Sequence, residues 1–199
     1  MKLTWLKKFI QNCYVMLCST RDNIHKMLKV LLIEFQAFKN NLDTYIIKEL
    51  CCGDLDSENY CRYLFKPPYK KCLLYPKVRT TNDWLERNWH RIGWYEGDVD
   101  YCNLRSILRH EVNSHSILIT KGREKAVFLE KILERNVINA EDLLPSSISL
   151  NDIRDGDIRC THTGKCAVKN VFKLREWIKS EPDYIKIFQH EVLGFEINK

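Results

Sequence analysis

The side chains best suited to chemistry lie between positions 160 and 166, where two thiols and one imidazole occur within seven residues. Cys160, His162 and Cys166 are residue types that bind zinc, which also accepts carboxylates in tetrahedral sites. Gly164 allows the chain to turn back between His162 and Cys166. The spacing lacks the second ligand pair of a standard zinc finger, so a fourth ligand must come from elsewhere. Two structural cysteines beside an exposed histidine are the alternative.

The composition favours a reduced, intracellular protein, either cytoplasmic or nuclear. The chain has 199 residues, of which 45% are hydrophobic, enough to bury the core of one domain with extensions. Its nine cysteines are odd in number and irregularly spaced, which indicates free thiols in a chain of this length. The apolar run at 13–18 is too short for a secretory signal, and no segment is long enough to span a membrane. A net charge of +6 is compatible with a polyanionic partner.

The first half of the chain predicts a helical extension followed by an antiparallel meander. Apolar residues recur at helical spacing, so residues 1–28 are expected to form a basic amphipathic extension that docks on the core or on a protein partner. Three strand-like runs with turn-forming residues between them cover residues 30–35, 44–50 and 60–65. Pro67 and Pro68 end the last run, since proline cannot donate to a strand ladder.

The second half alternates helices and strands after a long connection, residues 66–95. Apolar spacing predicts a helix, a strand, a helix, a short strand and a last helix over residues 104–112, 116–120, 126–133, 137–138 and 167–178. A meander followed by this alternation is the order of a mixed five-stranded sheet flanked by helices, as in the RNase H-like fold. We therefore expect an α/β domain over residues 29–180 and a C-terminal tail over residues 181–199.

Two segments resemble the second half of DEDD-type 3′-to-5′ exonucleases. They are residues 117–129 and 137–143. The first motif of that family, Asp-x-Glu, falls on Glu34-Phe35-Gln36, which keeps one carboxylate and has an amide in place of the other. Its second-motif Asp falls near Glu124 or Lys125, and its last near Asn170. Two-metal catalysis needs several carboxylates, so the resemblance implies that classical exonuclease activity is absent.

The Maelstrom domain is a better match, over residues 29–180. That family has the RNase H-like core without the exonuclease carboxylates, and it carries a Glu-Cys-His-Cys zinc tetrad. Four residues match the tetrad: Glu49, Cys160, His162 and Cys166. One residue separates Cys160 from His162 here, which departs from the family pattern. The resemblance implies a bound zinc ion and single-stranded RNA as the partner. The chain is also similar to a group of arthropod proteins linked to mobile elements or viruses, in residues 65–69, 84–85 and 97–98.

Glu49 is predicted to face the covered side of the sheet, with Lys48 facing the other way. Its strand face is expected to include Tyr45, Ile47 and Cys51. A lone carboxylate there is costly unless it is paired or bound to a metal. An edge-strand ion pair is the alternative for Glu49, and Cys51 or Cys52 could replace it as the fourth ligand. Cys166 begins the last helix, where the helix dipole favours a thiolate and hence metal binding.

The connection over residues 66–95 interleaves basic and aromatic side chains. Such a surface binds single-stranded nucleic acid, with bases stacked on aromatic rings and phosphates on Lys and Arg. The residues predicted to do so are Lys70, Lys71, Arg87, Arg91 and Trp94. Alternatively, the tryptophans of this segment complete the core.

Three function classes follow from these features. The first is a zinc-stabilised RNase H-like module that binds nucleic acid, preferably single-stranded RNA, without two-metal exonuclease activity. The second is an active ribonuclease, either a degenerate exonuclease using Glu34 or a weak metal-independent endonuclease, as the resemblance to Maelstrom domains implies. The third is a protein-interaction domain that uses the basic N-terminal helix and the aromatic connection. Fold alone does not choose among them.

Overall fold

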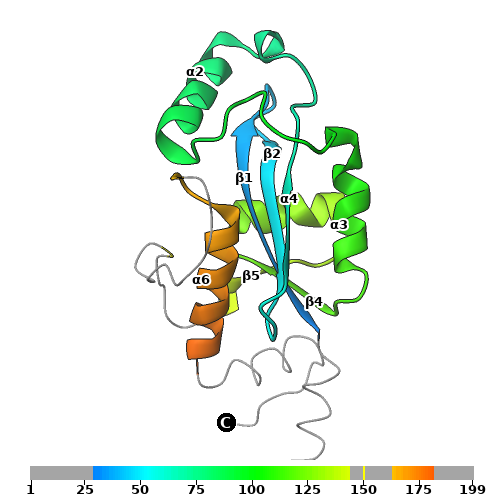
Figure 1. The fold of residues 1–199 in the computed structure, drawn as a ribbon. Helices are drawn as coiled ribbons and strands as arrows, with labels where there is room; N and C mark the ends of the chain where they lie inside the picture. The colour runs from blue at the N-terminus through cyan, green and yellow to red at the C-terminus, as the bar shows by residue number, and fades with distance from the viewer. Residues whose placement is uncertain (1–28, 144–149, 151–162, 182–199) are drawn as a thin grey trace, which may run out of the picture.

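A mixed five-stranded sheet lies at the centre of the structure, a computed structural model that describes residues 29–143, 150 and 163–181 (Figure 1). The strands lie in the order β3-β2-β1-β4-β5. Their bounds are β1 (Val30–Lys39), β2 (Tyr45–Asp54), β3 (Tyr60–Leu64), β4 (Ile117–Thr120) and β5 (Ile138–Asn139). The first three pair antiparallel, whereas β4 and β5 run parallel to β1. The predicted meander and the α/β class with a mixed five-stranded sheet are confirmed.

Helices cover both faces of this sheet (Figure 1). Their bounds are α2 (Pro76–Trp84), α3 (Leu104–Val112), α4 (Arg123–Leu133), α5 (Ala140–Leu143) and α6 (Ala167–Ser180), with short 3₁₀ helices η1 (Lys71–Leu73) and η3 (Tyr101–Asn103) and a π-helix η2 (Leu85–Trp89). Buried residues of α3 and α4 pack with Leu31 and Ile33 of β1, and those of α6 pack with Leu32. The prediction of a sheet flanked by helices is confirmed. The predicted N-terminal extension and nearly all of the tail lie outside the described residues.

A β-bulge at Lys48 changes which residues of β2 share a face. Successive residues of β1 pair with Glu49 and then with Ile47, so Lys48 has no partner residue on β1. The side chains before and after the bulge therefore alternate out of phase. Tyr45 and Ile47 pack with the α3 and α4 cluster, whereas Cys51 packs with α6. The prediction that Tyr45 and Ile47 share the face of Glu49 was wrong for this reason.

The Lys48 ammonium group fastens the connection after β3 to the sheet. Lys48 is only 1% exposed, and its Nζ donates hydrogen bonds to the carbonyl oxygens of Phe65 at 2.9 Å, Trp94 at 2.8 Å and Glu96. These oxygens stabilise the ammonium, but its removal from water still disfavours the charge. Burial lowers the pKa of Lys48 to about 8, against the opposing effect of the Glu96 and Glu86 charges.

The free energy of unfolding is expected to rise from pH 8 to pH 10.5 through Lys48, whose pKa is about 8 in the fold against an ordinary 10.5. Across this window the unfolded chain binds more protons than the folded chain, so stability increases with pH. The contribution is at most about 3 kcal/mol. Urea unfolding should show the parent gaining this much relative to Lys48→Met. Lys66→Met, which removes an exposed lysine, should follow the parent. Equal pH dependence of the parent and Lys48→Met would contradict the assignment.

Residues 76–84 form a helix where the sequence suggested an irregular connection. Pro76 is the first residue of α2, a position that suits its fixed φ. On the inner side of the helix, Asn82 is fully buried and forms two hydrogen bonds with the backbone of Lys39. Its Oδ1 accepts from the Lys39 N–H at 2.8 Å, and its Nδ2 donates to the Lys39 carbonyl at 2.9 Å. The amide thus attaches α2 to the end of β1. Within the described residues, no helix has the length and apolar character needed to cross a membrane.

Candidate functional site

Glu49 points from β2 towards the start of α6. Its carboxylate is fully buried, and Oε2 accepts a hydrogen bond from the Ala167 N–H at 2.8 Å. Oε1 accepts one from Nε of Arg62, on the neighbouring strand β3, at 2.7 Å. The ion pair considered as the alternative for Glu49 is therefore present.

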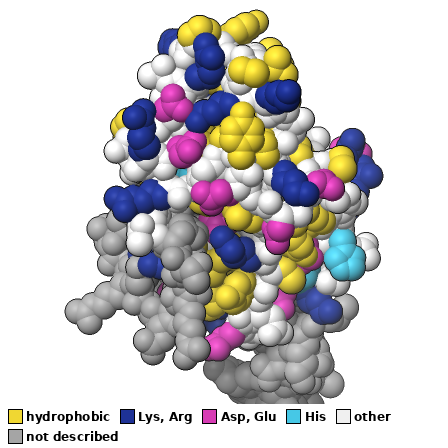
Figure 2. Space-filling model, turned by 45° about the horizontal axis from the view of Figure 1, so that its top comes forward, with side chains coloured by type: hydrophobic (Ala, Val, Ile, Leu, Met, Phe, Trp, Pro, Cys, Tyr) yellow, Lys and Arg dark blue, Asp and Glu magenta, His cyan; other side chains and the backbone are white. Residues whose placement is uncertain are grey.

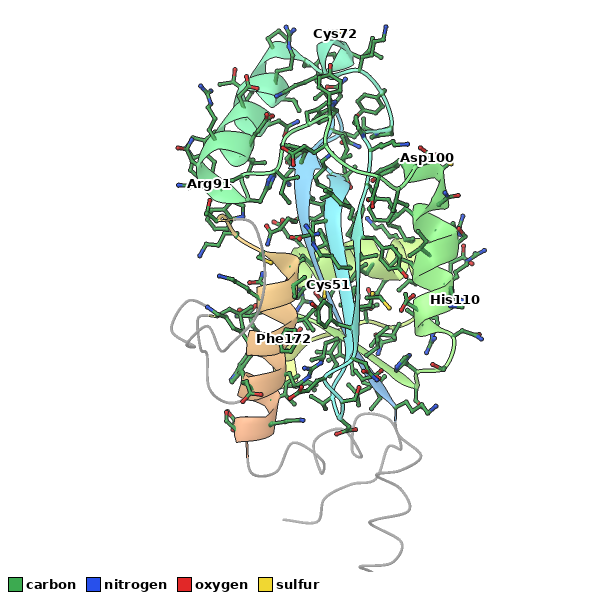
Figure 3. The ribbon with its side chains drawn as sticks, viewed as in Figure 1. Cys51, Cys72, Arg91, Asp100, His110 and Phe172 are labelled. Carbon is green, nitrogen blue, oxygen red and sulfur yellow. The ribbon has the colours of Figure 1, made fainter. Side chains whose placement is uncertain are left out.

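Cys166 is the N-cap residue of α6 and lies beside this carboxylate. Its side chain is buried, and its Sγ accepts a hydrogen bond from the Lys169 N–H at 3.5 Å. Cys51 lies between the sheet and α6 (Figure 3), where burial and then the charges of Glu49 and Cys166 raise the pKa of its thiol. Cys52 packs on the opposite face, so the alternative that made it the fourth ligand was wrong.

The structure describes half of the predicted zinc tetrad. Glu49 and Cys166, which are far apart in the sequence, both lie at the start of α6. Cys160 and His162 lie outside the described residues. In the described ranges, no group of three or more His, Cys, Asp or Glu side chains is arranged to hold a metal ion. A carboxylate and a thiol at a helix start are donors that zinc accepts, so the described pair fits this metal.

A close backbone contact positions the segment that leads to Cys166. A Cβ atom on Gly164 would lie 2.4 Å from the carbonyl oxygen of His90, so only glycine fits there without displacement. The next residue, Lys165, donates its N–H to the Trp89 carbonyl at 2.9 Å. The start of α6 is therefore anchored on the end of η2. Gly164 was expected to let the chain bend. In the structure, its lack of a side chain lets the backbone of residue 164 lie against the His90 carbonyl.

Glu34 is the carboxylate that remains at the exonuclease-like position, and it is buried within a set of hydrogen bonds. Its Oε1 accepts from the Thr120 hydroxyl at 3.3 Å and from the Lys121 N–H at 2.8 Å. Its Oε2 accepts from Lys125 Nζ at 2.6 Å and from Asn170 Nδ2 at 3.5 Å. Glu34, Lys125 and Asn170, which the resemblance assigned to three separate exonuclease motifs, therefore lie together. The Lys125 ammonium contacts the Glu34 carboxylate.

A pocket of about 310 Å³ opens beside this cluster, and we call it the Glu34 pocket. Besides Glu34, its lining includes Gln36, Trp89, Lys121, Lys125 and Lys165. Glu124, the other candidate at the second exonuclease motif, instead accepts a hydrogen bond from the Tyr45 hydroxyl at 2.8 Å. Lysines therefore line the pocket beside Glu34, whereas Glu124, the carboxylate considered for the second exonuclease motif, does not.

Trp94 lies in the core, which contradicts the prediction that it stacks on a base. It is 1% exposed, and its ring centroid is 5.0 Å from that of Phe38. Its Nε1 donates a hydrogen bond to the Tyr69 carbonyl at 3.3 Å. The physical reason is the inward path of the chain, because Lys48 holds the Trp94 carbonyl against the sheet. The core alternative is right for this tryptophan.

The four basic residues predicted to bind phosphate all lie on the connection, but one of them is paired with carboxylates. Three are exposed: Lys70, Arg87 and Arg91. Lys71 is held between two carboxylates, with its Nζ 2.7 Å from Asp83 and 2.8 Å from Glu86, so its charge is neutralised locally. Figure 3 shows Arg91 at the junction between the α2 end of the molecule and the start of α6.

The aromatic residues that the site prediction missed are Trp84 and Trp89. Trp84 is 51% exposed and Trp89 is 42% exposed, and their rings stack with centroids 6.3 Å apart and planes 29° apart. Figure 2 shows this end of the molecule, where Lys and Arg side chains alternate with exposed hydrophobic ones. We define the Trp84–Trp89 surface as these two rings with Arg87 and Arg91, which are close to them in the chain. The available signal was the position of both tryptophans on either side of Arg87.

Comparisons with protein-family models, curated proteins and solved structures find no match to this chain. Three features of the described residues could serve a function: the buried Glu49 beside Cys166, the Glu34–Lys125 pair and the exposed Trp84–Trp89 surface.

Proposed function

We propose that this protein is a zinc-stabilised, RNase H-like module that binds single-stranded nucleic acid, preferably RNA, and that it lacks two-metal exonuclease activity. The observation that carries the proposal is the Trp84–Trp89 surface. Two exposed, stacked indoles lie in a segment, residues 66–95, that has seven Lys and Arg and two acidic residues in a chain of net charge +6. Most of the net charge is therefore carried by the segment that contains the exposed rings.

The chemistry of this surface suits unpaired bases. An indole face stacks on any base, and exposed guanidinium and ammonium groups neutralise the backbone, so binding of this kind tolerates many sequences. The Nζ of Lys165 lies 5.4 Å from the centroid of the Trp89 ring, so a cation already lies close to one of the two rings. The preference for RNA rests on the resemblance to the Maelstrom domain. The RNase H-like assignment is supported by the strand order, with β1 flanked by β2 on one side and the parallel β4 on the other.

The zinc part of the proposal is supported by the Glu49 and Cys166 pair at the start of α6. Cys160 and His162 would complete the tetrahedral set, and the ion would join β2 to α6. The absence of two-metal chemistry is supported by Lys125, whose ammonium lies 2.6 Å from Glu34. A pair of magnesium ions needs several carboxylates, and a positive charge at this place opposes their binding.

Labelled single-stranded RNA is expected to bind with an affinity that falls steeply as salt increases. Each phosphate contact contributes about 0.7 to the log-log slope, so Arg87→Gln with Arg91→Gln should lower the slope by roughly 1.4. Trp84→Ala should weaken binding by about 1–3 kcal/mol through lost stacking, without destabilising the fold. Fluorescence anisotropy with an RNA of about 20 nucleotides measures both effects, because such sites cover ~4–16 nucleotides per module.

Two controls separate binding from folding. Arg109→Gln removes an exposed arginine on α3, away from this surface, and should leave the salt slope unchanged. Trp94→Ala removes a buried ring and should instead lower the free energy of unfolding by about 3–5 kcal/mol. If the parent shows no salt-dependent binding at low ionic strength, the nucleic-acid proposal fails and a protein-interaction domain becomes the better interpretation.

End-labelled RNA should remain intact in magnesium or manganese. A ladder of shortened products that disappears in Glu34→Gln would show instead that this carboxylate supports an exonuclease.

A further inference from the structure

Four large hydrophobic side chains are exposed together at one end of the structure. Leu42 is 85% exposed, Leu73 64%, Tyr75 63% and Tyr95 67%. They make up half of the eight large hydrophobic side chains that are exposed among the described residues. Figure 3 shows Cys72, which precedes Leu73, at the upper end of the molecule. We call these four side chains the Leu42 tip. Clusters of exposed apolar side chains mark interaction sites, because monomeric proteins rarely expose large apolar patches.

Hydrogen bonds join the two segments that carry most of the tip. Asn41 lies next to Leu42 in the turn between β1 and β2. Its Nδ2 donates to the Leu73 carbonyl at 3.2 Å, and its Oδ1 accepts from the Tyr75 N–H at 2.8 Å. The turn and η1 are therefore held side by side, and the fold itself keeps the two leucines exposed. A partner does not have to order this surface when it binds.

The side chains of the tip are of the kinds that proteins place at a lipid–water interface. Leu42 and Leu73 are aliphatic and can enter the acyl boundary of a bilayer. Tyr75 and Tyr95 have an apolar ring with a hydroxyl group, which suits the headgroup level. The Tyr95 hydroxyl accepts a hydrogen bond from the Lys71 N–H at 3.4 Å, so this ring lies beside η1. The tip therefore combines an apolar centre with amphipathic rings.

Two lysines add positive charge around the tip. Lys70 and Lys77 flank residues 71–76 in the chain, both are exposed, and neither forms an ion pair with another described residue. The carboxylate in the turn, Asp43, lies 3.4 Å from Lys39 Nζ and is compensated by it. The charge of the two flanking lysines is therefore available to an anionic surface. Near anionic lipids, each lysine strengthens binding about fivefold.

The residue types at the tip favour a lipid surface over a protein partner. Lys is depleted at protein interfaces, and Leu is under-represented among the residues that dominate their binding energy. Segments that lie in the membrane interface, in contrast, typically combine Leu with Lys. Figure 2 shows hydrophobic and basic side chains lying together over the upper end of the molecule. The Glu34 pocket and a second pocket of about 250 Å³ are both lined by residues outside the tip.

We propose that the Leu42 tip docks the protein on an anionic phospholipid membrane. Leu42 and Leu73 insert between the headgroups, and Lys70 and Lys77 contact the anionic lipids beside them. The site is separate from the Trp84–Trp89 surface, because the two share no residue and lie at opposite ends of α2. The proposal therefore does not depend on nucleic-acid binding.

Flotation of the full chain with lipid vesicles tests the proposal. The protein should float with vesicles of phosphatidylcholine and phosphatidylserine, and less with phosphatidylcholine alone. Leu42→Ser with Leu73→Ser should lower the partition coefficient at least about tenfold, because two aliphatic side chains no longer leave water. Lys70→Gln with Lys77→Gln should lower it roughly 30-fold on the mixed vesicles only, where the lipids are charged.

Controls separate the tip from other exposed side chains. Val127→Ser, at an exposed position on α4, should bind vesicles like the parent. All of these variants should melt like the parent, because the replaced side chains are exposed. A parent that does not float with the mixed vesicles, or parent-like flotation of Leu42→Ser with Leu73→Ser, would overturn the proposal. A concentration-dependent dimer that this double variant abolishes, without vesicle binding by the parent, would instead assign the tip to contact between copies of the chain.

Discussion

Zinc-free protein is expected to lose the packing of α6 against the sheet. Structural zinc contributes on the order of 10 kcal/mol in small domains, which is comparable with the whole folding free energy of a typical domain, about 5–15 kcal/mol. Two of the proposed ligands, Glu49 and Cys166, join β2 to the first turn of α6, so the loss falls on that helix. Elemental analysis of reduced protein should give one zinc per chain, and thermal unfolding with and without a chelator measures the stabilisation.

Matched variants distinguish a metal ligand from an ordinary buried residue. Cys166→Ser should bind less zinc and melt at a lower temperature, whereas Cys72→Ser, at an exposed cysteine, should behave like the parent. Glu49→Gln keeps an oxygen for the Ala167 N–H but should weaken zinc binding. Arg62→Gln removes the ion pair with Glu49 and should retain zinc. Reduced protein without stoichiometric zinc, or a Cys166→Ser variant that melts like the parent, would refute the zinc site.

Lys125→Met is expected to lower the free energy of unfolding by about 3–5 kcal/mol, the cost of leaving one member of a buried ion pair uncompensated. Glu34 is fully buried, whereas the Lys125 side chain is 23% exposed, so the loss should fall towards the lower end. Water can reach the lysine end of the pair and partly screen the remaining carboxylate. Urea unfolding at neutral pH, where the carboxylate is charged in the unfolded chain, measures the difference.

A double-mutant cycle isolates the electrostatic part of this effect. Adding Glu34→Gln to Lys125→Met should recover much of the lost stability, because no charge then remains buried without a partner. Lys131→Met, at an exposed lysine on the same helix, should change stability by no more than about 0.5 kcal/mol. Strictly additive losses in the cycle would mean that the pair is not coupled.

The strands and helices with regular apolar spacing could be predicted from sequence. Each of them buries one face, so its apolar residues repeat with the period of a strand or a helix. Both β1 and β2 extend beyond their predicted ends, to Lys39 and Asp54, since backbone pairing continues past the apolar run. The helix α2 was missed for a related reason. Its inner face carries Asn82, which is buried through hydrogen bonds to Lys39 and interrupts the apolar pattern.

The candidate site could be predicted in composition but not in geometry. The approach of Glu49 to the start of α6 joins residues far apart in the chain, which residue spacing does not contain, and the bulge at Lys48 corresponds to no pattern of residue types. The choice among tryptophans depends on which way the chain turns after η2. Trp84 lies outside and Trp94 inside because three carbonyl oxygens converge on the Lys48 ammonium, a tertiary contact that spacing does not contain.

The central strand also bears on how the chain reaches its native state. β2 follows β1 after a short turn, whereas β4 begins only at residue 117, so its pairing with β1 closes a much longer loop. Until β4 arrives, the edge formed by Val30, Leu31 and Leu32 is apolar and has unpaired backbone groups. Such an edge promotes association between chains. We therefore expect slow arrival of the second half of the chain to favour association between chains, and fragments that end before residue 117 to leave this edge open.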